Sequence, residues 1–285
     1  MVIPPRQARG QTQGKLKSKS PQVREFRAAL GPQSQLSFAT ECDPRAHFDL
    51  PSNKKYGPMT FMDFGYQYDK LSPLVDFFFA MCYGDLASKF FHAAHADNPL
   101  SALTHAIDTY PAPPEKLVVG LPLFFFDYTC DVGTAPDAQL CSIKDFYKTH
   151  NPDSTSALNP ISYAGVLALA AGKPVGSSRA GAVVTLNQLN VTEGSMFLNF
   201  HLPNETAIHQ IPYNTPESLS TKYKMLAAKK VHGTGFWVSS GRWPDNAPLS
   251  TAATQALWRS VQSNFLSNHR GGGVSTGMPR EQQRL

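Results

Sequence analysis

Few of the residue types that usually perform chemistry occur in this sequence at the spacing that chemistry requires. His92 and His95 lie three residues apart, which on a helix places two imidazoles on one face, as a metal site could use. No carboxylate or cysteine lies at a matching helical spacing to complete such a set. Cys42 and Cys82 form no C-x-x-C pair, and no glycine-rich segment has the pattern of a phosphate-binding loop. We therefore expect no metal, no nucleotide or other cofactor, and no serine triad.

Glu41 is an acid at a position where an acid could act. It directly follows the apolar segment 35–40, which has the composition of a strand. In parallel βα folds the functional side chains lie just beyond the carboxyl ends of the strands. The sequence shows no group that would position Glu41, so an ordinary exposed glutamate is the simpler interpretation.

Cysteines and glycosylation sequences suggest an oxidising, glycosylating compartment. Cys130 and Cys141 bracket a short polar loop, which suits a disulfide. Asn190-Val-Thr192 and Asn204-Glu-Thr206 are acceptor sequences for N-glycosylation. Free thiols and chance sequons are the alternative. The first twenty residues contain no apolar segment of the kind found in a signal peptide, so the chain as given does not explain how it would reach that compartment.

Composition and charge indicate a folded domain with polar ends. The 285 residues are 41% hydrophobic, and basic residues exceed acidic ones by 26 to 21. The basic excess is concentrated in the first thirty residues, so we expect no nucleic-acid partner. No apolar run reaches the ~20 residues that span a bilayer. We expect a disordered basic arm over 1–21, one folded domain over 22–268, and a disordered tail over 269–285.

Short apolar segments alternate with amphipathic ones inside the expected domain. Buried strands are predicted over 35–40, 77–83, 117–123 and 233–238. The second of these is apolar on both faces, as strands of parallel sheets are.

Helices are predicted over 98–110, 215–230 and 249–267, and the first two begin with a capping residue followed by proline. Residues 196–213, interrupted at Pro203-Asn204, predict a β-hairpin.

Strands that alternate with helices predict a parallel α/β architecture. Only about four βα units are visible, whereas a closed barrel has eight. We expect the four strands to be parallel and in chain order. We also expect Phe38, Phe78 and Phe236 to face the barrel interior and to be partly exposed, because half a barrel does not fill its own interior. The open edges of such a sheet predict self-association.

Several segments, taken in order, resemble the chitobiase-type members of glycoside hydrolase family 18. They are similar to the family's sixth strand, its seventh strand, the cysteine-closed loop, the hairpin with the helix after it, and the last strand. The segments are Asp76–Tyr83, Pro114–Pro122, Asp127–Cys141, His209–Ser218 and Gly233–Trp237. The resemblance covers residues 22–268. It implies strands 5–8 of a (β/α)8 TIM barrel with a β-hairpin insertion, and a secreted or lysosomal location.

The resemblance also implies which residues bind substrate. Tyr83 would hydrogen-bond to the acetamide carbonyl of an N-acetylglucosamine unit, and Trp237 would form the floor on which the sugar ring stacks. Tyr213 and Tyr128 would contact the substrate at the rim of the site. Ordinary buried or surface aromatic residues are the alternative at each position.

Departures from the family pattern bear on activity. None of the seven glutamates has an aspartate two residues before it, so the family's Asp-x-x-Asp-x-Asp-x-Glu segment, which contains the general acid, is absent. Gly84 replaces the aspartate that follows the tyrosine, and Asp85, one position later, is a candidate replacement. Leu123-Phe124 replaces an aromatic-tyrosine pair, and Asn214 replaces an aspartate.

Hydrolysis in this family is substrate-assisted, so the acid is the catalytic group that the protein must supply. The substrate's acetamide oxygen attacks the anomeric carbon while a carboxylic acid protonates the leaving oxygen. Without that acid the rate falls by ~10²–10⁴-fold. One hypothesis is a hydrolase of chitin-type or N-glycan-core oligosaccharides whose catalytic residues precede this chain. Another is a member that binds such sugars without cleaving them, and a third is a chain that does not fold stably.

Overall fold

A computed structural model describes residues 20–44, 67–83, 99–139, 141, 159–237 and 251–266. The first helix, α1, spans Ser20–Leu30 and therefore begins inside the segment that was expected to be a disordered arm. The rest of that arm and the expected tail lie outside the described residues, as do His92 and His95. Arg27 of α1 donates hydrogen bonds to the carbonyl of Leu74 at 2.8 Å and to Asp76 at 2.6 Å. These bonds hold α1 against the segment that leads into the strand beginning at Phe77.

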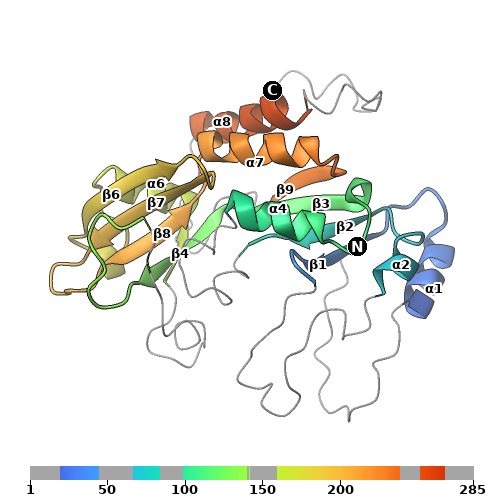
Figure 1. Ribbon diagram of the computed structural model, residues 1–285, viewed down its shortest axis with the longest axis horizontal. Helices are drawn as coiled ribbons and strands as arrows, with labels where there is room; N and C mark the ends of the chain where they lie inside the picture. Colours follow the sequence, from blue (N-terminus) through green and yellow to red (C-terminus); the bar gives the residue numbers. More distant parts are fainter. Residues whose placement is uncertain are drawn as a thin grey trace, which may run out of the picture.

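Four parallel strands form the first sheet, in the order β1-β2-β3-β9 (Figure 1). The strands are β1 Ser37–Glu41, β2 Phe77–Met81, β3 Leu117–Pro122 and β9 Gly233–Trp237. All three neighbouring pairs are parallel. The four predicted strands, their orientation and their order are confirmed. Each parallel connection must cross back over the sheet, which accounts for the long segments between the strands.

The face of this sheet that was predicted to point to the barrel interior is the face that packs against the helices. Phe236 packs against Tyr223 and Trp258, with ring centroids 6.3 and 6.1 Å apart, and these partners come from the helix layer. Phe38 and Phe78 lie on the same face and are only 8% and 0% exposed. The expectation that these three phenylalanines face the barrel interior is therefore wrong. Side chains alternate along a strand, so a one-residue error in assigning the inner face exchanges the two sets.

The opposite face of the sheet is only half-buried. It contains Phe77, Phe79 and Met81 of β2, which are all half-buried. The prediction that β2 is buried on both faces is therefore also wrong. Glycines of the neighbouring strands accommodate the Phe79 ring. A Cβ atom on Gly120 would lie 2.5 Å from Cζ of Phe79, and one on Gly235 would lie 3.3 Å from Cε2. The ring therefore lies across β3 and β9.

Helices cover the buried face of the parallel sheet (Figure 1). The layer consists of α4 Leu100–Asp108, α7 Pro216–Ala228 and α8 Thr251–Val261, and a π-helical turn, Gln262–Leu266, follows α8. The predicted cap of α7 is confirmed, because the Thr215 hydroxyl accepts from the backbone N–H of Ser218 and the Ser218 hydroxyl accepts from that of Thr215. The N-cap of α4 is Pro99 and not the predicted Asn98. Two short helices, α2 Tyr68–Leu71 and a 3-10 turn Pro114–Lys116, precede β2 and β3.

A second, antiparallel sheet of five strands lies beside the parallel one (Figure 1). Its order is β5-β4-β8-β7-β6, and the strands are β4 Phe124–Thr129, β5 Asn159–Ser162, β6 Val183–Asn190, β7 Ser195–His201 and β8 His209–Tyr213. Helix α6, Tyr163–Ala170, and a 3-10 turn, Ser177–Arg179, connect β5 to β6. The predicted hairpin over 196–213 is confirmed as β7 and β8, but it is part of a larger sheet. The sequence reasoning missed β4, β5 and β6.

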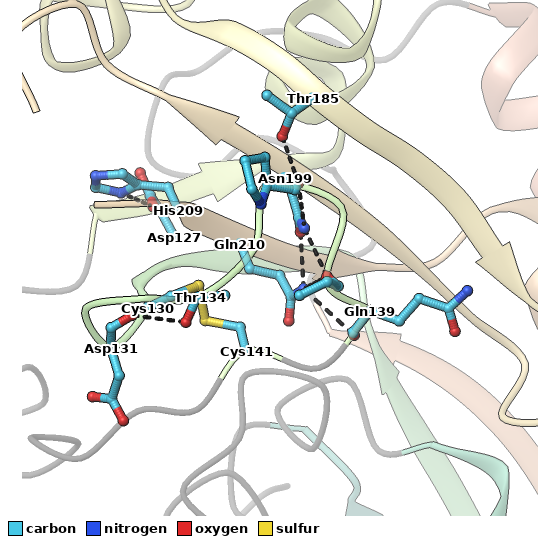
Figure 2. Close-up of a disulfide and its surroundings, with 12 residues drawn as sticks. Asp127, Cys130, Asp131, Thr134, Gln139, Cys141, Thr185, Asn199, His209 and Gln210 are labelled. Atoms are coloured by element: carbon cyan, nitrogen blue, oxygen red, sulfur yellow. Dashed lines mark hydrogen bonds and ion pairs between the residues drawn. A yellow bond between two sulfur atoms is a disulfide. The ribbon is translucent and has the colours of Figure 1, made fainter. Parts of the chain in front are cut away.

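The loop between Cys130 and Cys141 is closed by a disulfide, with Cα atoms 5.3 Å apart, so this predicted pairing is confirmed. Figure 2 shows the loop lying against side-chain amides of the antiparallel sheet. Asn199 donates to the carbonyl of Ala138 at 2.7 Å, and Gln210 donates to the same carbonyl at 3.2 Å. Both amides are fully buried, so they satisfy backbone carbonyls that the loop would otherwise bury unpaired.

A second disulfide joins Cys42 to Cys82, with Cα atoms 4.5 Å apart. Glu41 and Met81 are paired in the register of β1 and β2, so the two cysteines are the next residues of neighbouring parallel strands. The sequence reasoning missed this bond because it considered only C-x-x-C spacing.

Removing the Cys42–Cys82 disulfide is expected to destabilise the protein more than removing Cys130–Cys141. The two bonds close segments with sequence separations of 40 and 11 residues. The loop-closure entropy that they remove from the unfolded chain corresponds to about 4 and about 3 kcal/mol respectively. Urea denaturation of the Cys42→Ala/Cys82→Ala and Cys130→Ala/Cys141→Ala variants measures both free energies of unfolding. A smaller loss in the first variant would contradict this ranking.

Candidate substrate-binding site

Two aromatic side chains meet at the carboxyl edge of the parallel sheet. Tyr83 follows β2 and Trp237 is the last residue of β9. Their rings are stacked, with centroids 6.4 Å apart and planes inclined by 15°. The Trp237 side chain is 48% exposed, and Phe124 packs edge-on against Tyr83 at 5.8 Å. The structure therefore brings together the two residues that the sequence singled out for sugar binding, although they are more than 150 positions apart in the chain.

The fold explains why these side chains point the same way. Tyr83 continues the alternation of Phe77, Phe79 and Met81, which places it on the face away from the helices. Trp237 is in register with Pro122, and the carbonyl of Trp237 accepts a hydrogen bond of 2.8 Å from the backbone N–H of Leu123. Both aromatic residues thus extend from strand ends that are held by the sheet.

Neighbouring bonds restrict the backbone at Tyr83 further. The backbone N–H of Cys82 donates to the carbonyl of Gly120 at 3.0 Å, and its side chain forms the disulfide to Cys42. The residue immediately before Tyr83 is therefore tied both to β3 and to the end of β1. This restraint lowers the conformational entropy that a ligand would otherwise have to remove on binding.

The arrangement offers stacking surface and polar aromatic groups. An indole ring and a phenol ring present apolar faces together with one N–H and one O–H donor, a combination suited to a pyranose with an acetamide substituent. Glu41 ends β1 at the same edge of the sheet, in register with Met81. The register thus places a carboxylate beside the last residue of β2, two positions before Tyr83.

Of the remaining predicted substrate-binding residues, the structure describes only Tyr128 and Tyr213. Asp85 and Gly84 lie outside the described residues. Tyr128 and Tyr213 are 0% and 2% exposed, so the expected position of both at the rim is wrong. The Tyr213 hydroxyl donates to Oδ1 of Asn187 at 2.8 Å, and burial raises the pKa of Tyr213 to about 12. These tyrosines form part of the interior of the antiparallel sheet.

Asn214, which replaces a family aspartate, lies in a buried polar contact between α7 and β3. Its Oδ1 accepts from Nζ of Lys222 at 2.9 Å, and its Nδ2 donates to the carbonyl of Pro122 at 3.5 Å. Both Asn214 and Lys222 are 0% exposed. The amide thus links the buried Lys222 side chain to the carboxyl end of β3, where Pro122 is in register with Trp237.

A buried charge network in the antiparallel sheet was not predicted from the sequence. Asp127 on β4 accepts a hydrogen bond from Nε of Arg179 at 3.1 Å. The other carboxylate oxygen of Asp127 contacts Nδ1 of His209 at 2.8 Å (Figure 2). The other ring nitrogen of His209 contacts Glu205 at 2.9 Å. Asp127, Arg179 and His209 are 6–7% exposed.

The two carboxylates determine the protonation of His209. Burial by itself lowers the pKa of His209, but the hydrogen bonds and charges of Asp127 and then Glu205 outweigh it and raise this pKa above its ordinary value. With a carboxylate at each ring nitrogen, the imidazolium form donates both hydrogen bonds. The network is a structural feature of the antiparallel sheet, since its members lie on β4, on β8 and in the turns that precede β6 and β8.

Among the described residues, no group of three histidine, cysteine, aspartate or glutamate side chains is arranged to hold a metal ion. The same part of the chain contains no helix long and apolar enough to cross a membrane.

Sequence comparisons find curated relatives of this chain. The chain is 26% identical over 201 residues to di-N-acetylchitobiase of Mus musculus, covering 69% of this chain and 51% of that protein. It is 23% identical over 205 residues to the di-N-acetylchitobiase of Homo sapiens, covering 70% and 50% of the two chains. No family model matches the chain. The chain thus spans about half the length of the curated relatives that it matches.

A solved structure shows the same fold. The GH18 chitinase from Cycas revoluta, determined in complex with (GlcNAc)3, superimposes with a TM-score of 0.51 at 18% sequence identity, over 76% of this chain and 57% of that one. The GH18 chitinases that this chain resembles have the TIM-barrel fold. Sequence and fold together support the resemblance to chitobiase-like members of glycoside hydrolase family 18, over part of the family's length.

Proposed function

We propose that this chain provides the sugar-binding part of a chitobiase-like or chitinase-like glycosidase that acts on N-acetylglucosamine-containing oligosaccharides. The observation that supports this most is the stacked pair of Tyr83 and Trp237 at the carboxyl edge of a parallel sheet. That edge is where ligands bind in parallel βα folds. The curated relatives named above are di-N-acetylchitobiases, and the matched chitinase structure contains (GlcNAc)3. These names and this ligand belong to the class of sugar that we propose for this chain.

The residues have distinct roles in this proposal. Trp237, with about half of its surface exposed, supports the flat apolar face of one sugar ring. The Tyr83 hydroxyl donates a hydrogen bond to the acetamide carbonyl of that sugar, which holds the acetamide near the anomeric carbon. Phe124 walls the tyrosine ring from the side and limits access of water.

We further propose that the described strands correspond to strands 5–8 of a (β/α)8 barrel, and that the 285 residues do not cleave a glycosidic bond by themselves. In support, four parallel strands are half of the eight that a closed barrel contains. The family's acid segment does not occur in the sequence. We also predict self-association through the outer edges of β1 and β9, because exposed strand edges can pair with other chains.

A binding protein without catalytic activity is the second candidate. It is favoured by Phe124, which offers no hydroxyl where the family has a tyrosine, and by Asn214, whose neutral amide occupies the position of a carboxylate. In this candidate the same aromatic pair binds the sugar, and no acid is required anywhere in the protein. The secreted or lysosomal location is part of either proposal and is supported by the two disulfides.

A fluorogenic N,N′-diacetylchitobioside tests the catalytic part of the proposal. We expect no turnover above the buffer rate from the 285-residue chain, because the leaving oxygen has no positioned acid to protonate it. Light scattering alongside the assay reports the state of association of the same sample.

Turnover that disappears in the Tyr83→Phe variant would contradict the proposal that this chain cannot cleave the bond. Turnover that survives in Tyr83→Phe but disappears in Glu41→Gln would identify Glu41 as a relocated acid.

A further inference from the structure

The two N-glycosylation sequons occupy different kinds of structure. Asn190 is the last residue of β6, and Asn204 lies in the turn between β7 and β8. An acceptor asparagine must present its side-chain amide nitrogen to a large oligosaccharide and keep it in solvent afterwards. The two sites differ in this respect, and neither belongs to the proposed sugar-binding site.

The Asn190 side chain is used by the protein itself. Its Oδ1 accepts from the backbone N–H groups of Thr192 and Glu193, both at 3.1 Å, which closes an Asx turn. Its Nδ2 points to Oε1 of Gln139 at 3.4 Å, and Gln139 belongs to the loop closed by the Cys130–Cys141 disulfide. A glycan attached to this nitrogen would compete with the Gln139 side chain for the space beside it.

The turn after Asn190 also joins the two parts of the fold. The carbonyl of Glu193 accepts from the backbone N–H of Leu100 at 2.8 Å. Its carboxylate accepts from the backbone N–H and the hydroxyl of Ser101 at 3.1 and 2.8 Å. The Asx turn that Asn190 closes therefore positions Glu193 to cap the amino end of α4.

Asn204 lies in an exposed turn that is firmly attached at both sides. Asn204, Glu205 and Thr206 are all exposed. Before the sequon, Cγ of Pro203 would lie 2.7 Å from a Cβ atom on Gly181, so this proline packs closely on that glycine. After it, Glu205 contacts His209 at 2.9 Å. The turn presents the asparagine to solvent on a defined backbone.

We propose that the protein carries one N-linked glycan, on Asn204, and that Asn190 is a structural residue and not an acceptor. The donor is a lipid diphosphate-linked oligosaccharide. Nδ2 of Asn204 forms the bond to its anomeric carbon, the bond from that carbon to the diphosphate oxygen breaks, and one amide proton is lost. All four cysteines of the chain are paired in disulfides, as expected of a protein from the compartment where this transfer takes place.

The test uses two variants that remove one sequon each and leave both asparagines in place. The full chain is secreted from mammalian cells behind an added signal peptide, and its mass is measured before and after peptide N-glycosidase treatment. Thr192→Val is a matched control, because the Asx turn uses the backbone N–H of Thr192 and not its hydroxyl. We expect one glycan in the parent chain and in Thr192→Val, and none in Thr206→Val.

Peptide mapping after the enzyme treatment locates the glycan, because the modified asparagine becomes aspartate. Conversion at position 204 alone supports the proposal. Conversion at position 190, a parent chain with two glycans, or a parent chain with none would each overturn it. If little protein is secreted, the same analysis of the intracellular pool distinguishes these outcomes.

Discussion

Replacing Trp237 by alanine is expected to weaken binding of tri-N-acetylchitotriose about 30-fold. Removing an aromatic residue that a ligand contacts centrally costs about 2 kcal/mol, and every 1.4 kcal/mol is a factor of about ten. Trp237 is 48% exposed and stacks on Tyr83, so its ring is both accessible and held in place. Isothermal titration calorimetry measures the change in affinity directly.

The chain offers a matched control for this experiment. Trp258 on α8 is 53% exposed, but it packs on Phe236 at the helix-covered face of the parallel sheet. Trp258→Ala should therefore leave the affinity unchanged within about two-fold, since surface substitutions away from a site usually change free energies by less than 0.5 kcal/mol. Equal losses in both variants, or no loss in Trp237→Ala, would contradict the assignment of Trp237 to the sugar site.

Replacing Asp127 by asparagine is expected to lower the free energy of unfolding by about 3–5 kcal/mol, the usual cost of removing one partner from a buried ion pair. The side chain keeps its size but loses the charge that faces Arg179 and His209. Urea denaturation measures the loss. Glu205→Gln is the control, because the Glu205 side chain is 47% exposed and the contribution of such a pair is below about 1 kcal/mol.

The same network predicts a dependence of stability on pH. Because Asp127 and Glu205 raise the pKa of His209 in the folded protein, its stabilising contribution is complete below the ordinary value of 6.5 and is lost as the pH rises through the raised value. Asp127→Asn removes the stronger cause of that shift and should flatten this part of the stability profile. An unchanged profile in Asp127→Asn, or a loss below about 1 kcal/mol, would contradict the role of the network.

The parallel sheet was predictable because its signal is local. Each of its strands is a short apolar segment, and the segments between them are long enough for a crossover. What the pattern does not fix is which face of each strand points inward. The assignment of Phe78 to the interior was wrong for that reason, although its neighbours Phe77 and Phe79 are equally apolar. Only the helix layer, through contacts such as Phe236 with Tyr223, distinguishes the two faces.

The antiparallel sheet was harder to predict because β4 follows β3 almost directly. Residues 117–126 form one nearly continuous apolar segment, and periodicity alone does not show that a new strand begins at Phe124. Once β4 was missed, Asp127 had no partner in view, because His209 is 82 positions away in the sequence. Contacts of this kind depend on tertiary pairing, which composition and spacing do not reveal.

The candidate site was predicted in part. Tyr83 and Trp237 were identified through resemblance, and the structure places them together. The Cys42–Cys82 disulfide beside them could have been found from the sequence, since both cysteines lie near the carboxyl ends of strands predicted to be neighbours, 35–40 and 77–83. Tyr128 and Tyr213 were placed at the rim through the same resemblance, but the extra strands of the antiparallel sheet bury both.

A crystal structure of the chain with tri-N-acetylchitotriose tests the proposed function most directly. We predict one sugar ring stacked on the indole of Trp237, its acetamide carbonyl oxygen within about 2.6–3.2 Å of the Tyr83 hydroxyl, and all glycosidic bonds intact. A trisaccharide bound elsewhere on the protein would contradict the assignment of the site. Cleaved products at the site would contradict the proposal that these residues bind the sugar without hydrolysing it.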